Sequence, residues 1–93
     1  MDQRDAIVRR SREEVVVGIL SSCARNAMPL GKLMHGENLS YKLLKTYITR
    51  LVNLELISLE KVGRKWLART TKHGIEAVGL YQEAISLLNG RKV

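Results

Sequence analysis

The chain has 93 residues and a mass of 10.5 kDa, so we expect residues 1–93 to form a single domain with one modest core. Hydrophobic residues make up 45% and charged residues 27%, which argues against a disordered or low-complexity chain. Sixteen Lys and Arg against nine Asp and Glu give a net charge of +7. This excess of positive charge indicates a polyanionic partner, either nucleic acid or an acidic membrane surface.

The sequence shows no feature typical of a membrane protein or of an enzyme. Its longest apolar run, Val15 to Leu20, is far shorter than the roughly 18–20 residues of a membrane span, and no signal peptide is visible, so we expect a cytoplasmic protein. The lone Cys23 fits a reducing compartment, and His35 and His73 have no partner for a zinc site. We find no nucleophile–base pair and no phosphate-binding loop, and we expect no catalysis, metal or cofactor.

The first elements are a helix, a short strand and a second helix. A helix is predicted from Arg4 to about Ala24, because apolar residues recur there at three- and four-residue steps: Val8, Val15, Val16, Ile19, Leu20 and Cys23. This pattern places the Cys23 thiol in the core, where it is chemically inert. Pro29 and Gly31 end that helix and leave 28–30 as a short strand, and a helix of about two turns follows over 32–37 with Leu33 and Met34 facing inward.

The third predicted helix has one apolar and one basic side. Ser40 is placed to cap it, because its hydroxyl oxygen accepts a free amide proton of the first turn. The buried stripe recurs at steps of three and four and contains Leu44, Tyr47, Ile48, Leu51 and Leu54. The opposite, exposed side carries Tyr41, Lys42, Lys45, Thr46 and Thr49.

From Ile57 the apolar period changes to two, which predicts a β-hairpin. Ile57, Leu59 and Lys61 alternate with polar residues before a turn at Gly63, and the return strand contains Trp66, Leu67 and Ala68. The tip of the hairpin is basic, with Lys61, Arg64 and Lys65. We expect Trp66 to pack in the core or against the hairpin rather than to stack on a base.

The last predicted helix runs over 71–89, capped by Thr71 and closed by Gly90. Its apolar residues lie on one side, and four of them have the three-four-three spacing of a coiled-coil seam: Val78, Tyr81, Ile85 and Leu88. We expect this seam to form a homodimer interface. The alternative is that the same face packs entirely on its own domain.

The order helix, short strand, helix, helix, hairpin, helix is that of a winged helix-turn-helix domain, a mainly α fold with a small β-hairpin. Two stretches of the chain resemble the archaeal ten-kilodalton winged-helix DNA-binding proteins. The first is 33–57, in which Asn38-Leu39-Ser40-Tyr41-Lys42 opens the long helix, and the second is Thr70-Thr71-Lys72-His73-Gly74. In that family the terminal helix pairs with its copy in an antiparallel coiled coil. The chain departs from the family at Glu55, where a Gly is usual after the third helix, so we expect Glu55 to make the tight left-handed turn there. It also departs at Ala68, a strand position that is often aromatic.

The resemblance implies that the third helix is a recognition helix for double-stranded DNA and that the hairpin is a wing. The implied helix contacts are Ser40, Tyr41, Lys42, Lys45, Thr46, Thr49 and Arg50. The implied wing contacts, to backbone phosphates or an adjacent minor groove, are Lys61, Arg64 and Lys65. Between residues 38 and 75 there are eight Lys or Arg and two Glu, a net +6, so most of the charge lies in this region.

These observations lead us to expect a small, homodimeric, nucleoid-associated protein that acts as a transcription regulator or an architectural chromatin protein. A second hypothesis stays open, in which the fold is a protein-interaction module and the basic face docks an acidic partner. RNA binding is a third, although the chain lacks the paired sheet aromatics that stack single-stranded bases.

Overall fold

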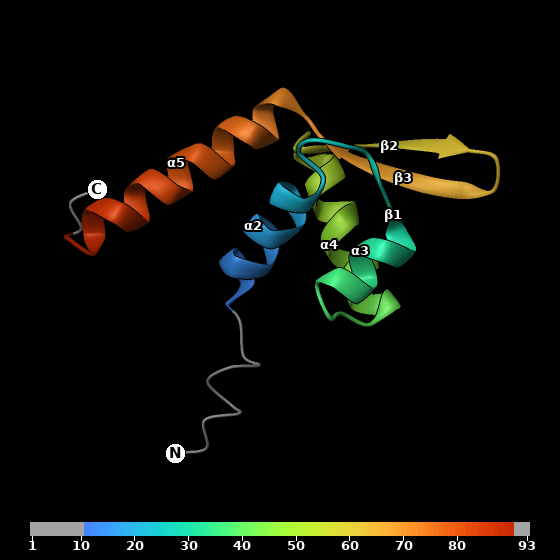
Figure 1. Cartoon of the computed structure of the whole chain (residues 1–93), viewed down its shortest axis with the longest axis horizontal. Helices are drawn as coiled ribbons and strands as arrows, with labels where there is room; N and C mark the ends of the chain where they lie inside the picture. The colour runs from blue at the N-terminus through green and yellow to red at the C-terminus, as the bar shows by residue number, and fades with distance from the viewer. Residues whose placement is uncertain (1–10, 91–93) are drawn as a thin grey trace, which may run out of the picture.

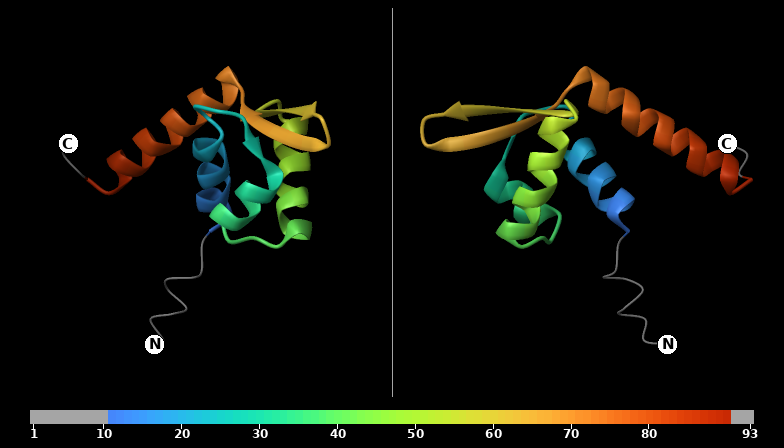
Figure 2. Two further views of the ribbon diagram at one scale, coloured as in Figure 1. Left: turned by 45° about the vertical axis from the view of Figure 1, so that its right-hand side comes forward. Right: turned by 180° about the vertical axis from the view of Figure 1, so that it is seen from behind.

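The computed structural model describes residues 11–90 (Figure 1). In chain order the elements are α2 (Arg12–Ser22), β1 (Met28–Pro29), α3 (Leu30–Gly36), α4 (Tyr41–Asn53), β2 (Ile57–Val62), β3 (Lys65–Thr70) and α5 (Lys72–Leu88). This order confirms the predicted winged helix-turn-helix fold, which is mainly helical with a small sheet. The β2–β3 hairpin and α5 project in opposite directions from the body formed by α2, α3 and α4 (Figures 1 and 2).

The sheet has three antiparallel strands in the order β1-β3-β2. The predicted hairpin is therefore correct but incomplete, because Met28 pairs with Ala68 and adds β1 to its edge. β2 and β3 are joined by the two-residue loop of Gly63 and Arg64. Gly63 has φ 63°. It is the first loop residue, where a type II′ hairpin turn requires the positive φ that Gly adopts without strain.

The core lies where α2, α3 and α4 meet the inner end of the sheet. Its buried apolar residues are Val15, Ile19, Leu20, Cys23, Leu33, Leu44, Ile48, Leu51, Ile57 and Ala68. The predicted stripe of α4 is confirmed except at Leu54, which is 56% exposed. The helix ends at Asn53 and Leu54 is its C-cap, so the helical spacing that would bury Leu54 stops one residue before it.

Two helix boundaries differ from the prediction. Ser11 is extended and accepts the Glu14 amide at 3.1 Å, while the Glu14 carboxylate accepts the Ser11 amide at 2.9 Å. This capping box begins α2 at Arg12, so the predicted continuous helix from Arg4 is wrong at Ser11, and 4–10 lie outside the described residues. α3 begins at Leu30, two residues earlier than predicted, and Pro29 is its extended N-cap residue, without a side-chain cap bond.

Both α3 and α4 end in a Schellman motif whose left-handed residue is not glycine. Glu55 has φ 63°, and its amide donates to the Val52 carbonyl at 2.9 Å while the Leu56 amide donates to the Leu51 carbonyl at 2.9 Å. Asn38, after α3, has φ 57°. The left-handed turn expected at Glu55 is therefore confirmed, at a conformational cost that a Gly would avoid.

Two adjacent threonines join the wing to the rest of the fold. The Thr70 hydroxyl donates to the Leu20 carbonyl at 2.6 Å, and the Thr70 amide donates to the Cys23 carbonyl at 3.1 Å. The Thr71 hydroxyl donates to the Glu55 carbonyl at 2.7 Å and accepts the Gly74 amide at 3.0 Å. These bonds satisfy the last carbonyls of α2 and the first amides of α5, which would otherwise lack helical partners.

Gly74 is the point of closest approach between α5 and the turn after α4. A Cβ there would overlap the Leu56 carbonyl oxygen and come within 2.6 Å of the Thr70 methyl. We therefore expect Gly74→Ala to lower the free energy of unfolding by about 1–3 kcal/mol, measured by urea denaturation, even though Ala favours helix more than Gly does.

Gly79, in the same helix, is the matched control, because a Cβ there would meet no atom within 4 Å. Gly79→Ala should raise the free energy of unfolding by about 0.5–1 kcal/mol. Equal stability of Gly74→Ala and wild type would contradict the close approach.

Candidate nucleic-acid interface

The exposed side of α4 carries the predicted contact residues. Ser40 caps the helix, and its oxygen accepts the Leu43 amide at 3.1 Å, which leaves its hydroxyl proton available to a ligand. The other predicted contact residues of this helix are all exposed: Tyr41, Lys42, Lys45, Thr46, Thr49 and Arg50. Within residues 11–90, none of the three cationic side chains among them forms an ion pair, so their charges stay available to an anionic partner.

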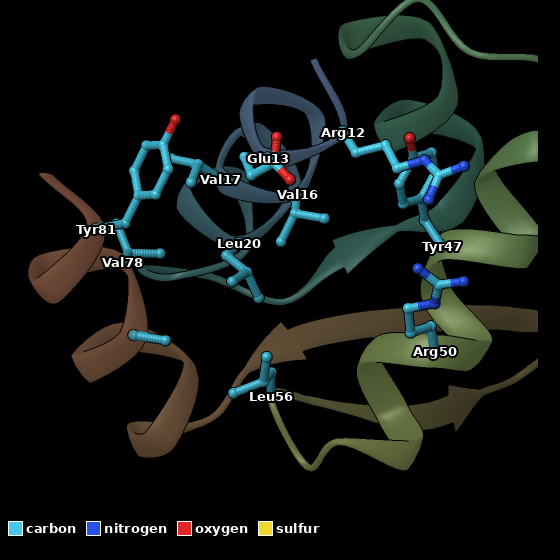
Figure 3. A pocket seen from close by; sticks show the side chains of 11 residues that line it. Arg12, Glu13, Val16, Val17, Leu20, Tyr47, Arg50, Leu56, Val78 and Tyr81 are labelled. Atoms are coloured by element: carbon cyan, nitrogen blue, oxygen red, sulfur yellow. The ribbon is translucent and has the colours of Figure 1, made fainter. Parts of the chain in front are cut away.

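These residues divide between two flanks of α4. Tyr41, Lys45 and Thr49 line a cavity on the wing side of α4. Leu59 of β2 and Trp66 of β3 line the same cavity. Arg50 instead lies on the α2 side, where it lines a groove with Arg12 (Figure 3). The structure therefore separates Arg50 from Tyr41, Lys45 and Thr49, with which the resemblance grouped it as contacts of the recognition helix.

The wing is basic along its outer half. Lys61, Arg64 and Lys65 are exposed, and Arg64 lies in the loop at the tip. The Lys61 ammonium lies 5.7 Å from the centre of the Trp66 ring, a cation–π contact between residues directly opposite each other on β2 and β3. The wing thus combines cationic groups with an aromatic surface.

Trp66 and Lys32 belong to this surface and were not predicted to. Trp66 is 46% exposed and lies outside the buried core, so it takes the second of the two expected arrangements and packs on the wing, where the Lys61 ammonium lies over its ring. The strand alternation places Trp66 on the same face as Ala68, but nearer the tip of the wing, where it lies beside Leu30 of α3 and Tyr41 of α4 and stays exposed. Lys32 comes close because Pro29 pairs with Leu67, a register that no local sequence pattern reveals.

α5 contributes two kinds of apolar surface. Val78 and Tyr81 are half-buried and form one wall of a groove of about 290 Å³, opposite Val16 and Leu20 of α2 (Figure 3). The other predicted seam residues are more exposed, Ile85 at 38% and Leu88 at 81%. Packing on its own domain therefore accounts for the first half of the seam but not for the second.

The Cys23 thiol is fully buried, as predicted. Burial, and secondly the charge of Glu37, raises the pKa of Cys23 to about 11 from its ordinary 9.0. A thiol of this kind is protonated at neutral pH and is a poor nucleophile. Among residues 11–90 no group of three His, Cys, Asp or Glu is placed to hold a metal ion. His35 and His73 are exposed, as expected.

The fold and the basic face of α4 and the wing together define a winged-helix protein. A family model described as winged helix-turn-helix matches residues 9–89. The chain therefore belongs to the winged helix-turn-helix family. Among curated proteins, none matches the sequence significantly.

Three solved structures share this fold at low sequence identity. AF1382 of Archaeoglobus fulgidus is 15% identical with a TM-score of 0.68, over 91% of this chain and 96% of its own. MepR of S. aureus, solved in complex with DNA, is 14% identical with a TM-score of 0.71, over 95% of this chain and 74% of its own. NolR of Sinorhizobium fredii is 18% identical with a TM-score of 0.65, over 94% of this chain and 82% of its own.

The helices of the described part of the chain do not include a membrane-spanning segment. No helix between residues 11 and 90 is both long and apolar enough to cross a bilayer.

The buried Cys23 predicts a specific pH dependence of stability. Because its folded pKa of about 11 lies above the ordinary 9.0, its contribution is complete below pH 9 and is lost as the pH rises from 9 to 11. We therefore expect wild type to lose stability relative to Cys23→Ala as the pH rises through this interval. The difference in their unfolding free energies should change by at most about 1.4 kcal/mol per pH unit.

Urea denaturation of both proteins between pH 7 and pH 11 measures this difference. Every other titratable group is common to both proteins, so its contribution cancels in the difference. A difference that stays constant over the whole range would contradict the raised pKa.

Proposed function

We propose that this protein binds double-stranded DNA without catalysis, as a small transcription regulator or an architectural chromatin protein associated with the nucleoid in the cytoplasm. The observation that carries the proposal is the net +6 between residues 38 and 75, which falls on α4 and the wing in a winged-helix arrangement. The DNA complex of MepR, a protein of the same fold, supports it, as does the resemblance to the archaeal ten-kilodalton family.

α4 is the proposed recognition helix. A helix of this size fits the major groove, and Lys42, Lys45 and Thr46 project from its exposed side toward base edges or flanking phosphates. The Thr46 hydroxyl donates to the Lys42 carbonyl at 3.1 Å, so toward DNA it acts as an acceptor. Ser40, Tyr41 and Thr49 complete the proposed contacts of this helix.

The wing and the far flank of α4 supply the phosphate contacts. Arg64 lies at the tip of the hairpin, with Lys61 and Lys65 on the strands beside it. Arg50 lies on the α2 side of α4 and would meet a phosphate on the other side of the groove. Contacts of this kind fix the position of the protein on DNA and add affinity for any sequence.

A homodimer through α5 is the second part of the proposal. α5 projects from the body (Figures 1 and 2), and its outer half carries Ile85 and Leu88, which are both exposed. Continuing the seam of Val78 and Tyr81, these side chains would pack against a second copy and remove apolar surface from water.

The phosphate contacts predict a strong salt dependence. The logarithm of the binding constant should fall linearly with the logarithm of salt concentration, with a slope of about −0.9 per neutralised phosphate. Combining Arg64→Ala with Lys65→Ala should make the slope shallower by about 1.8 and lower the affinity for all duplex sequences by a similar factor. Lys45→Ala should instead reduce the preference among sequences if that side chain reads a base.

Fluorescence anisotropy with labelled duplexes at several salt concentrations measures these effects. Arg25→Ala is the matched control, because Arg25 is exposed beside Ile75 and Gln82, on the α5 side of the molecule. It removes one charge and should change affinity least. A binding constant insensitive to salt would overturn the proposal, and binding only to an acidic protein would favour the interaction-module alternative.

The proposed dimer is tested by a charge placed in the seam. Wild type should sediment at twice 10.5 kDa at micromolar concentration, and Ile85→Lys should sediment at 10.5 kDa. Ile85 is already 38% exposed, so the variant should keep its fold, as circular dichroism can check.

Glu83→Lys is the control for this variant. Glu83 is exposed and lies about 160° around the helix from Ile85, so its lysine should leave the dimer intact. A wild-type protein that sediments at 10.5 kDa at every concentration would contradict the dimer.

A further inference from the structure

Two adjoining cavities separate the wing from the start of α4. One has a volume of about 410 Å³ and the other about 270 Å³, and both are lined by Leu30, Tyr41 and Trp66. We call the two together the wing cleft. Its combined size is in the range of small-ligand pockets, about 300–1,000 Å³.

The wing cleft exposes two aromatic rings that the fold does not need for its core. Tyr41 is 58% and Trp66 46% exposed, and neither belongs to the buried cluster. Lys61 lies over the Trp66 ring but lines neither cavity, so it leaves the cleft side of the ring accessible. The cleft therefore holds flat apolar surfaces on which another ring could stack.

The polar groups of the wing cleft are cationic. Lys32 and Lys65 line the larger cavity and Lys45 the smaller, and no acidic residue lines either. Leu30, Leu44, Ile48 and Leu59 supply apolar walls. A ligand that matches this lining combines a planar ring with one or more negative charges, which is the chemistry of a nucleotide within a strand.

We propose that the wing cleft takes an unpaired nucleotide of DNA, whose base stacks on Trp66 and Tyr41 while its phosphates meet Lys32, Lys45 and Lys65. This inference rests on the DNA surface proposed above and extends it from paired DNA to DNA with an unpaired base. A paired base stays in its stack and cannot enter the cleft, whereas an unpaired base leaves its stack at little cost. The protein then prefers DNA with an unpaired base.

The test compares a 20-base-pair duplex with the same duplex carrying one extra, unpaired thymine. Wild type should bind the duplex with the unpaired thymine at least about fivefold more tightly. Removing an aromatic side chain on which one base stacks lowers binding affinity by about this factor or more. Trp66 is the only tryptophan of the chain, so its fluorescence should be quenched by the unpaired thymine and much less by the paired duplex.

Trp66→Ala should abolish the preference, so that the variant binds the two duplexes with equal affinity, whereas Trp66→Phe should retain part of the preference. Val62→Ala is the matched control, because Val62 is 52% exposed and lies on the other face of the same hairpin. It should keep the full preference.

Equal affinity of wild type for the two duplexes, or a preference that survives Trp66→Ala, would overturn the inference while leaving the duplex-binding proposal intact. Failure to bind either duplex would overturn both.

Discussion

The hydrogen bonds of Thr70 and Thr71 fix the arrangement on which the rest of the structure depends. The Thr70 hydroxyl holds the last turn of α2 through the Leu20 carbonyl, and the Thr71 hydroxyl holds the turn after α4 through the Glu55 carbonyl. The wing ends and α5 begins at these two residues, so the same bonds set the directions in which both project (Figure 1). Gly74 allows the close approach, because any side chain there would strike the Leu56 carbonyl.

This junction separates two surfaces with different chemistry. On one side α4 and the wing present cationic and aromatic side chains, which suit a polyanion that also carries flat bases. On the other side the outer half of α5 presents aliphatic residues such as Ile85 and Leu88, which suit a second apolar helix. In a dimer joined through α5, the two basic faces would be held at a distance set by the length and crossing of the two helices, and that spacing would select the separation of two half-sites on DNA.

The local patterns of the sequence were sufficient for the elements and most of the core, because caps and apolar periods are properties of neighbouring residues. The caps at Ser40 and Thr71 and the left-handed turn at Glu55 are confirmed. The features that the local patterns do not predict depend on tertiary contacts or lie at the ends of helices. Whether Trp66 packs in the core or on the wing depends on how the sheet meets α3 and α4, and the approach of Lys32 to Trp66 depends on the pairing of β1 with β3. Neither has a local pattern. The start of α2 does have one, because Ser11 and Glu14 form a capping box, and this cap outweighs the apolar period that continues before it.

The most direct test of the account is to map the DNA-binding surface by NMR. A titration of isotope-labelled protein with a duplex should shift amide signals of α4 and the wing, between residues 40 and 50 and between 61 and 66, and leave those of the outer half of α5 unchanged. Shifts confined to α2 and α5, or no shifts at low salt, would contradict the account, because they would show that the concentrated positive charge does not meet DNA.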